Sequence, residues 1–136
     1  MPSIKDISWQ NLASVHDNRG ILTSVESDID IPFEVKRIFY MHHVISERGG
    51  HAHIDTDQLV IAISGSFIIK LFDGGNSAEF KMNDPTKGLY IPRMIFIELF
   101  DFSPDAVSLV LASTNYDMKK SIRNLDEYLK SVNLKQ

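Results

Sequence analysis

Residues 58–73, "QLVIAISGSFIIKLFD", form a nearly continuous apolar stretch that predicts the fold class of the chain. The stretch is rich in Val, Ile and Phe, which favour strands, and it is interrupted at Ser64 and Gly65. A Ser-Gly pair between apolar runs is typical of a tight turn, so two consecutive buried strands are expected. The next segment, "FDGGNSAEF" over residues 72–80, predicts a hairpin because its adjacent glycines permit positive φ angles.

Outward from this centre, shorter segments alternate apolar and polar residues, as strands with one buried face do. In "FEVKRIFYMHHV", residues 33–44, period two puts five side chains on one face: Phe33, Val35, Arg37, Phe39 and Met41. Many short strands with turn residues between them, from about residue 20 to 113, predict an all-β sandwich or small barrel.

The last part of the chain changes its period. Over residues 117–133, apolar side chains recur at steps of three and four, which predicts one amphipathic C-terminal α-helix: Ile122, Leu125, Leu129 and Val132. No linker or low-complexity segment divides the chain, so residues 1–136 are expected to form a single domain.

Composition excludes several classes of protein. The formal net charge is −4 and the basic residues are dispersed, so no footprint for nucleic acid is visible. Cysteine is absent, which excludes disulfides and thiol chemistry. No apolar run approaches a membrane span, and the N-terminal residues lack the layout of a signal peptide. We therefore expect a cytoplasmic protein with neither nucleic acid nor membrane as a partner.

The chain contains two close pairs of histidines. His51 and His53 are separated by one residue, so on a strand both imidazoles lie on one face and can converge on one ion or one substrate. The alternative is an ordinary hydrogen-bonded or surface pair. His42 and His43 are adjacent, which would put them on opposite faces of a strand, and we interpret both as structural.

The segment around His51 and His53 resembles the first motif of the cupin superfamily, which implies a double-sheet jelly roll. A carboxylate normally occupies the position of Gln58. In the second motif, Met94 stands where a glycine is usual and Ile97 where a metal-binding His is usual. Only two of the four expected ligands are kept, whereas a catalytic metal needs at least three. We therefore predict no metal.

Within the cupins, the chain resembles the sugar-nucleotide 3,4-ketoisomerases over nearly its whole length. The resemblance is carried by "DNRGILTSVE", "FEVKRIFYM", "ERGGHAHIDTDQLVIAISGSF", "KGLYIPRMIFIELFDFSPDAVSLVLAS" and "YDMKKSIRNLDEYLK". It implies a homodimer with no cofactor that acts on dTDP-4-keto-6-deoxy-D-glucose. The keto group moves from C4 to C3, and the product feeds an aminotransferase that makes a 3-amino-3,6-dideoxysugar.

This reaction needs a proton removed from C3, an enediol, and reprotonation at C4. Imidazole suits the task because its pKa lies near working pH. We expect His51 to be the main base and His53 its polar partner at the sugar oxygens. Tyr40 is a third catalytic candidate, since a phenol can stabilise or protonate the developing oxyanion. Tyr40 and Phe39 lie on opposite faces, however, and only one of them can point inward.

Five further residues are predicted to bind substrate. Arg48 precedes two glycines, and its guanidinium fits diphosphate oxygens. Arg19 resembles a family position that reaches into the sugar pocket. Gln58 can orient a histidine or bind a sugar hydroxyl, and Arg37 and Ile97 complete the set. With Arg19 present and residue 97 apolar, the galacto configuration at C4 is favoured over gluco.

Two other functions stay open. A 3,5-epimerase acts on the same 4-keto sugar, but its family typically pairs one His with an Asp and a Tyr. A non-catalytic cupin that binds a nucleotide sugar is the alternative from another class.

Overall fold

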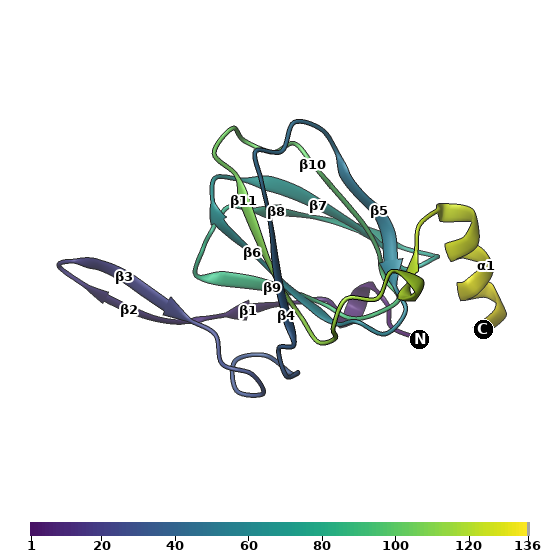
Figure 1. The fold of residues 1–136 in the computed structure, drawn as a ribbon, viewed down its shortest axis with the longest axis horizontal. Helices are drawn as coiled ribbons and strands as arrows, with labels where there is room; N and C mark the ends of the chain where they lie inside the picture. The colour runs from purple at the N-terminus through teal and green to yellow at the C-terminus, as the bar shows by residue number, and fades with distance from the viewer. Residues whose placement is uncertain (136) are drawn as a thin grey trace.

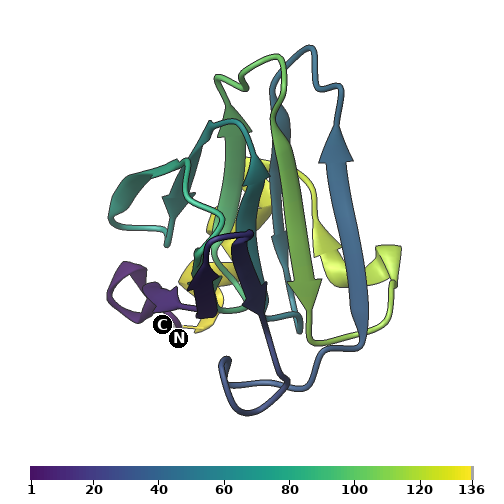
Figure 2. The ribbon, with the colours of Figure 1, turned by 90° about the vertical axis from the view of Figure 1, so that its left-hand side faces the viewer.

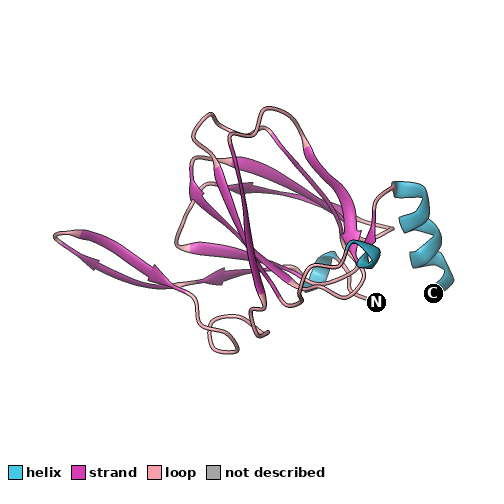
Figure 3. Cartoon of the chain, in the orientation of Figure 1, coloured by secondary structure: helices cyan, strands magenta, loops and turns pink. Residues whose placement is uncertain are grey.

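The computed structural model describes residues 1–135 and contains two five-stranded antiparallel sheets that face each other (Figures 1 and 3). The first sheet has the order β1 (Ser8–Asn11), β9 (Lys87–Ile91), β6 (Gln58–Ser64), β11 (Val107–Ala112) and β4 (Arg37–His42). The second has the order β12 (Ser121–Ile122), β5 (Arg48–His53), β10 (Phe96–Phe100), β7 (Phe67–Phe72) and β8 (Ser77–Met82). This double sheet is the predicted architecture.

The apolar stretch at residues 58–73 forms two strands that lie in different sheets. The turn at Gly65 carries the chain from β6 in the first sheet to β7 in the second. Gly65 has φ +64°, and a Cβ there would lie 2.8 Å from the Cα of Ala106, so only glycine fits. The predicted hairpin follows, with Phe72 opposite Ser77 in the β7–β8 pair.

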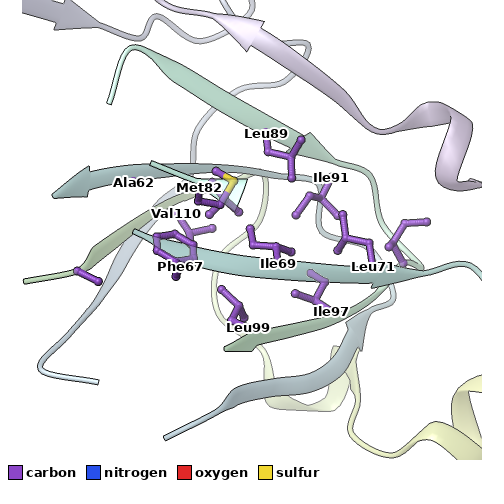
Figure 4. Packing of buried hydrophobic residues seen from close by; sticks show 13 residues of the cluster. Ala62, Phe67, Ile69, Leu71, Met82, Leu89, Ile91, Ile97, Leu99 and Val110 are labelled. Carbon is purple, nitrogen blue, oxygen red and sulfur yellow. The ribbon is translucent and has the colours of Figure 1, made fainter. Parts of the chain in front are cut away.

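The main hydrophobic core lies between the sheets (Figure 4). Alternate side chains of β7 and β10 meet those of β6, β9 and β11 there, and members of the cluster include Phe67, Ile69, Leu71, Leu89, Ile97, Leu99 and Val110. Because successive side chains of a strand point to opposite faces, the alternation also fixes which polar side chains point between the sheets. The site described below depends on this alternation.

The outer face of the second sheet is covered by α1 (Leu125–Lys135). Tyr128 is fully buried there, and its hydroxyl donates towards the main-chain oxygens of Met94 (2.7 Å) and Phe72 (3.0 Å). No helix within residues 1–135 is long and apolar enough to span a membrane.

The predicted start of this helix, residue 117, is wrong. Residues Met118–Lys120 form a short 3-10 helix (η2), and Ser121 and Ile122 then pair with β5 as strand β12. Pairing with β5 satisfies the main chain of these residues and buries Ile122 beneath the helix. The helix begins only after Asn124, whose side-chain oxygen accepts from the amide of Glu127 at 2.8 Å.

The predicted first strand, near residue 20, is also too late, because strands begin at Ser8. After the short 3-10 helix η1 (Ile4–Asp6), β1 joins the first sheet, and β2 (Ala13–Asp17) and β3 (Gly20–Ser24) pair with each other. We call β2 and β3 the arm. The arm extends away from the two sheets in Figure 1 and points at the viewer in Figure 2. The prediction included β3, within the alternating residues 20–27, but missed β1 and β2, and neither face of the arm is buried by the chain itself.

Candidate active site

His51 and His53 both point between the sheets from β5. His51 lies opposite Ile97 of β10, which belongs to the core. Ala52, between the two histidines, is fully buried on the other face, beneath α1. The prediction that the two imidazoles share one face is therefore confirmed, and packing on both faces of β5 fixes their direction.

The two imidazoles are in contact with each other and with Gln58. The Nε2 atoms of His51 and His53 are 3.2 Å apart, with the rings nearly perpendicular at 89°. The side-chain nitrogen of Gln58 lies 3.1 Å from the same Nε2 of His53, and Gln58 is 4% exposed. One proton can lie between the two Nε2 atoms, so a proton accepted by one ring can be passed to the other. The side-chain amide of Gln58 also suits either tautomer of His53, because rotation of the amide presents either its NH₂ donor or its oxygen acceptor to Nε2.

Burial keeps both histidines neutral. The pKa of His53 is lowered to about 4, chiefly by desolvation and also by the charges of His51, Arg37 and Arg123, while the charge of Asp55 opposes the shift. Desolvation also lowers the pKa of His51, and the carbonyl of Gly49 opposes this shift. Neutral imidazoles at physiological pH are what general-base catalysis requires.

A hollow of about 230 Å³ lies in front of His51, between β4 and β5. Its walls combine the polar groups of Arg48, His51 and Gln58 with apolar side chains, including those of Phe39 and Ile97. A side chain at residue 49 would not fit beside it, because a Cβ there would lie 2.6 Å from the carbonyl oxygen of Ile97, and φ is +95°. Two of the predicted binding residues, Arg48 and Gln58, line the same hollow as His51, and Ile97 forms part of the floor of this hollow.

The donor set at this hollow differs from a cupin metal centre. It comprises two imidazoles and one amide, with an apolar side chain at Ile97 where a third imidazole would be needed. Within residues 1–135 no three His, Asp or Glu side chains form a group that fits a metal ion. The expectation that no metal takes part stays a prediction.

The register of β4 decides between Phe39 and Tyr40. Burial alternates along the strand, and Phe39 packs against the core between the sheets. The side chain of Tyr40 points outward and is 62% exposed. Tyr40 is among the residues that line the hollow, but its side chain belongs to the outer face, so the hydroxyl predicted at the sugar is absent from the inner face of β4. A catalytic role for Tyr40 stays a prediction.

Arg37 lies near the histidine pair, whereas Arg19 lies far from it. Arg37 is on the inner face of β4, its guanidinium lies 5.1 Å from the centroid of Phe39, and its charge acts on His53. Arg19 lies instead between β2 and β3 at the end of the arm, where it forms an ion pair with Asp17 at 2.7 Å and its side chain is 86% exposed. A single copy of the chain therefore does not bring Arg19 to the histidines.

Arg123 is a site residue that sequence reasoning missed. Ser121 lies opposite His53 and Ile122 opposite Ala52, and Arg123 directly follows β12, at the end of this pairing that is nearest to His51. Its charge lowers the pKa of both histidines. The predicted helix had included Arg123, and only the pairing of β12 with β5 reveals its position.

Comparison with known proteins identifies the family. The family model described as "FdtA: WxcM-like, C-terminal" matches residues 5–133. The chain belongs to this family. It is 36% identical, over 93% of its length and 94% of the relative's, to a TDP-4-oxo-6-deoxy-alpha-D-glucose-3,4-oxoisomerase of Aneurinibacillus thermoaerophilus.

Solved structures of family members are closely similar. QdtA, a sugar 3,4-ketoisomerase from Thermoanaerobacterium thermosaccharolyticum solved with TDP, has a TM-score of 0.93 at 36% identity, over 97% of this chain and 98% of QdtA. The WlaRB TDP-quinovose 3,4-ketoisomerase from Campylobacter jejuni has a TM-score of 0.89 at 42% identity, over 93% and 99%. The predicted resemblance, the cupin jelly roll and the isomerase class are confirmed.

The epimerase alternative receives support only at the level of the fold. The RmlC epimerase of Mycobacterium tuberculosis has a TM-score of 0.76 at 13% identity, over 90% of this chain and 70% of the epimerase.

Proposed function

We propose that this chain isomerises dTDP-4-keto-6-deoxy-D-glucose to the corresponding 3-keto sugar nucleotide, with His51 as the base. The observation that carries the proposal is the buried, neutral imidazole pair at the wall of the hollow between β4 and β5. Membership of a family whose members include TDP-sugar 3,4-ketoisomerases supports the choice of substrate.

The reaction balances with proton transfers alone. His51 takes the proton from C3, which is acidic because C4 is a ketone, and the electron pair of that bond forms the enediolate. The hydroxyl on C3 loses its proton, and O4 accepts a proton. His53 is placed to carry a proton between these two oxygens, because its Nε2 lies 3.2 Å from the Nε2 of His51. Return of a proton to C4 then leaves the ketone at C3.

Ile97 makes the floor of this pocket apolar, so no acid faces the sugar from β10 at that position. With Arg19 as the other predicted determinant, we propose the galacto configuration at C4. Proton coupling constants between C4 and C5 of the isolated product distinguish galacto from gluco.

The direct test is incubation of the purified protein with dTDP-4-keto-6-deoxyglucose in deuterated water, followed by NMR. We expect a 3-keto product, and deuterium at C5 would instead identify a 3,5-epimerase. Binding of the nucleotide sugar without any change would identify a non-catalytic protein. The His51→Asn variant serves as the matched control, because it keeps a polar side chain of similar shape but cannot act as a base.

We also propose that the active form is a homodimer in which the arms are exchanged. The arm exposes apolar side chains to solvent: Val15 is 61% exposed, Ile21 58% and Leu22 65%. Beside the base of the arm, an apolar hollow of about 530 Å³ follows the outer face of the first sheet, and Ile38, Ile61 and Leu109 line it with other residues. The strand β4 also leaves one edge free for pairing in this sheet. A second copy that supplies its arm would cover these surfaces.

Arm exchange also explains how Arg19 could reach a sugar pocket that is distant in its own chain. Mixing Arg19→Ala with His51→Asn subunits tests this. If Arg19 acts on the partner's site, each mixed dimer has one intact site, so about a quarter of wild-type activity returns after subunit exchange. If the activity does not return while mixed dimers form, Arg19 does not act across the interface. Localisation in the cytoplasm stays a prediction.

A further inference from the structure

The turn between β9 and β10 is hydrogen-bonded to both strands that supply the contact between His53 and Gln58. The amide of Met94, in this turn, donates to the main-chain oxygen of His53, the last residue of β5, at 2.8 Å. The amide of Arg93 donates to the carboxylate of Asp57 at 2.8 Å, and the guanidinium donates to it at 3.1 and 3.2 Å. Asp57 directly precedes Gln58, where β6 begins. One turn therefore fixes the main chain beside both side chains of the contact, which is 3.1 Å long.

Met94 gives this turn a main-chain conformation that its residue type disfavours. Its φ is +65°, in the left-handed region where a side chain crowds the main chain and glycine is favoured. Its side chain is nevertheless buried beneath α1, in a cluster with Ala52 and Ile122. A strained residue keeps such a conformation only where its surroundings hold it. The groups that bind Met94 therefore decide where the turn lies.

One of these groups is the hydroxyl of Tyr128 in α1, the yellow helix beside the end of β5 in Figure 1. The hydroxyl lies 2.7 Å from the carbonyl oxygen of Met94 and 3.0 Å from that of Phe72. It has a single proton, and the shorter distance assigns this proton to Met94. The ring of Tyr128 packs separately against Phe96, with the ring centroids 5.3 Å apart. A phenylalanine at residue 128 would therefore keep the packing and remove only the buried donor.

We propose that Tyr128 is a positioning residue for the catalytic pair and acts on His53 through the main chain of Met94. The hydroxyl of Tyr128 holds the carbonyl of Met94, and the amide of Met94 holds the carbonyl of His53. The imidazole of His53 then meets His51 and Gln58. The inference deepens the proposed function and rests on it, because the role of His53 in the reaction belongs to that proposal. It gives α1 a part in catalysis, although none of the described residues of this helix lines the hollow.

The contacts of His53 tolerate little movement of its main chain. Its Nε2 lies 3.2 Å from that of His51 and 3.1 Å from the amide nitrogen of Gln58, and a hydrogen bond is lost by about 3.6 Å. A catalytic group that is misplaced by about 1 Å can cost roughly 100-fold in rate. His51 is held separately by its place opposite Ile97 in the pairing of β5 with β10. Loss of the Tyr128 hydroxyl should therefore lower the rate of the chemical step and leave substrate binding intact.

Steady-state kinetics of Tyr128→Phe with the 4-keto sugar nucleotide test the positioning role. We expect kcat to fall roughly tenfold while KM and the affinity for dTDP stay within about twofold of the wild type. Val132→Ala is the matched control, because this apolar side chain is buried beneath the same helix and cannot hydrogen-bond to the turn. It should unfold at a lower temperature and keep wild-type kcat. Wild-type kcat in Tyr128→Phe would overturn the proposal, as would an equal fall of kcat in Val132→Ala.

A second measurement follows the ring nitrogens of His53 by NMR in protein labelled with ¹⁵N-histidine and needs no turnover. In Tyr128→Phe the signals of this ring should shift, and its ring proton should exchange with water about tenfold faster than in the wild type. Val132→Ala should give wild-type signals. Unchanged His53 signals in Tyr128→Phe would overturn the route through Met94. If the wild type isomerises nothing but the His53 signals respond to Tyr128→Phe, the proposed function is refuted and the positioning of His53 by Tyr128 stands.

Discussion

Two histidine pairs in this chain make similar ring-to-ring contacts in very different surroundings. The Nδ1 atoms of His42 and His43 lie 2.7 Å apart, closer than the 3.2 Å between the Nε2 atoms of His51 and His53. The first pair is exposed, and its rings contact each other and, on one side, Tyr40. The second pair is partly buried between two sheets and also contacts Gln58.

The difference shows that proximity alone does not make a catalytic pair. At the surface, water solvates the rings of the first pair, and no strand from the facing sheet packs over them within residues 1–135. Between the sheets, burial lowers the pKa of both rings, and Gln58 accommodates either tautomer without adding charge. A carboxylate at residue 58 would favour the protonated form instead.

The largest expected effect comes from His51→Asn. Loss of a general base lowers kcat by roughly 10²–10⁴-fold, and binding of dTDP should persist because the backbone and the arginines are unchanged. Steady-state kinetics with the 4-keto sugar nucleotide and titration with dTDP measure the two properties. His42→Asn is the control from the exposed pair and should keep wild-type kcat. Equal rates in both variants would show that the buried pair does not carry the chemistry.

A smaller effect is expected from Gln58→Glu, which puts the usual cupin carboxylate beside His53. The negative charge should raise the pKa of the pair by about 1–3 units, so the acid limb of the profile of kcat/KM against pH should move upward. At pH 6.5 we expect activity to fall by up to about fourfold, with recovery above pH 8. Gln58→Met is the uncharged control. A profile in Gln58→Glu that overlays the wild-type profile would mean that residue 58 does not set the basicity of the pair.

The buried pair should also make stability depend on pH. The pKa of His53 is about 4 in the folded protein and 6.5 as the ordinary value, so between these values the unfolded chain binds more protons. Stability is therefore fully present above pH 6.5 and is lost as pH falls towards 4. Partial exposure of the ring limits the loss to about 1–3 kcal/mol. Urea unfolding at pH 7.5 and 4.5 measures it, and the loss should shrink in His53→Asn.

The sequence was most informative where one face of a strand is buried by the same chain. The nearly continuous apolar run over residues 58–73, interrupted at Ser64 and Gly65, predicts both strands. The spacing of His51 and His53 predicts their shared face, because successive strand residues alternate between two faces. The same rule failed at His43, since its φ of +54° ends the strand and turns the ring back towards His42. A positive φ in a residue other than glycine leaves no mark in the sequence.

Contacts between distant strands were beyond sequence reasoning. Arg123 reaches the site because β12 pairs with β5, and Tyr40 faces away because of the register of β4 on β11. Both placements depend on pairing between strands that are far apart in the sequence. After residue 117, the spacing of the apolar residues favoured a helix, but tertiary pairing overrides this local preference. The first half of the arm, β2, escaped prediction for a related reason, since the apolar side chains of the arm are not covered within one chain.

The smallest effect is expected from His43→Gly, which removes the exposed pair altogether. A non-glycine residue at φ +54° costs about 1–2 kcal/mol, and glycine relieves that cost but loses about 0.5–1 kcal/mol through the greater freedom of the unfolded chain. The surface contact with His42 contributes little because water replaces it. We therefore expect unchanged kcat and a stability gain below about 1 kcal/mol, measured by thermal unfolding. If kcat instead falls more than a few-fold, the exposed pair takes part in the reaction, and the contrast between the two pairs is wrong.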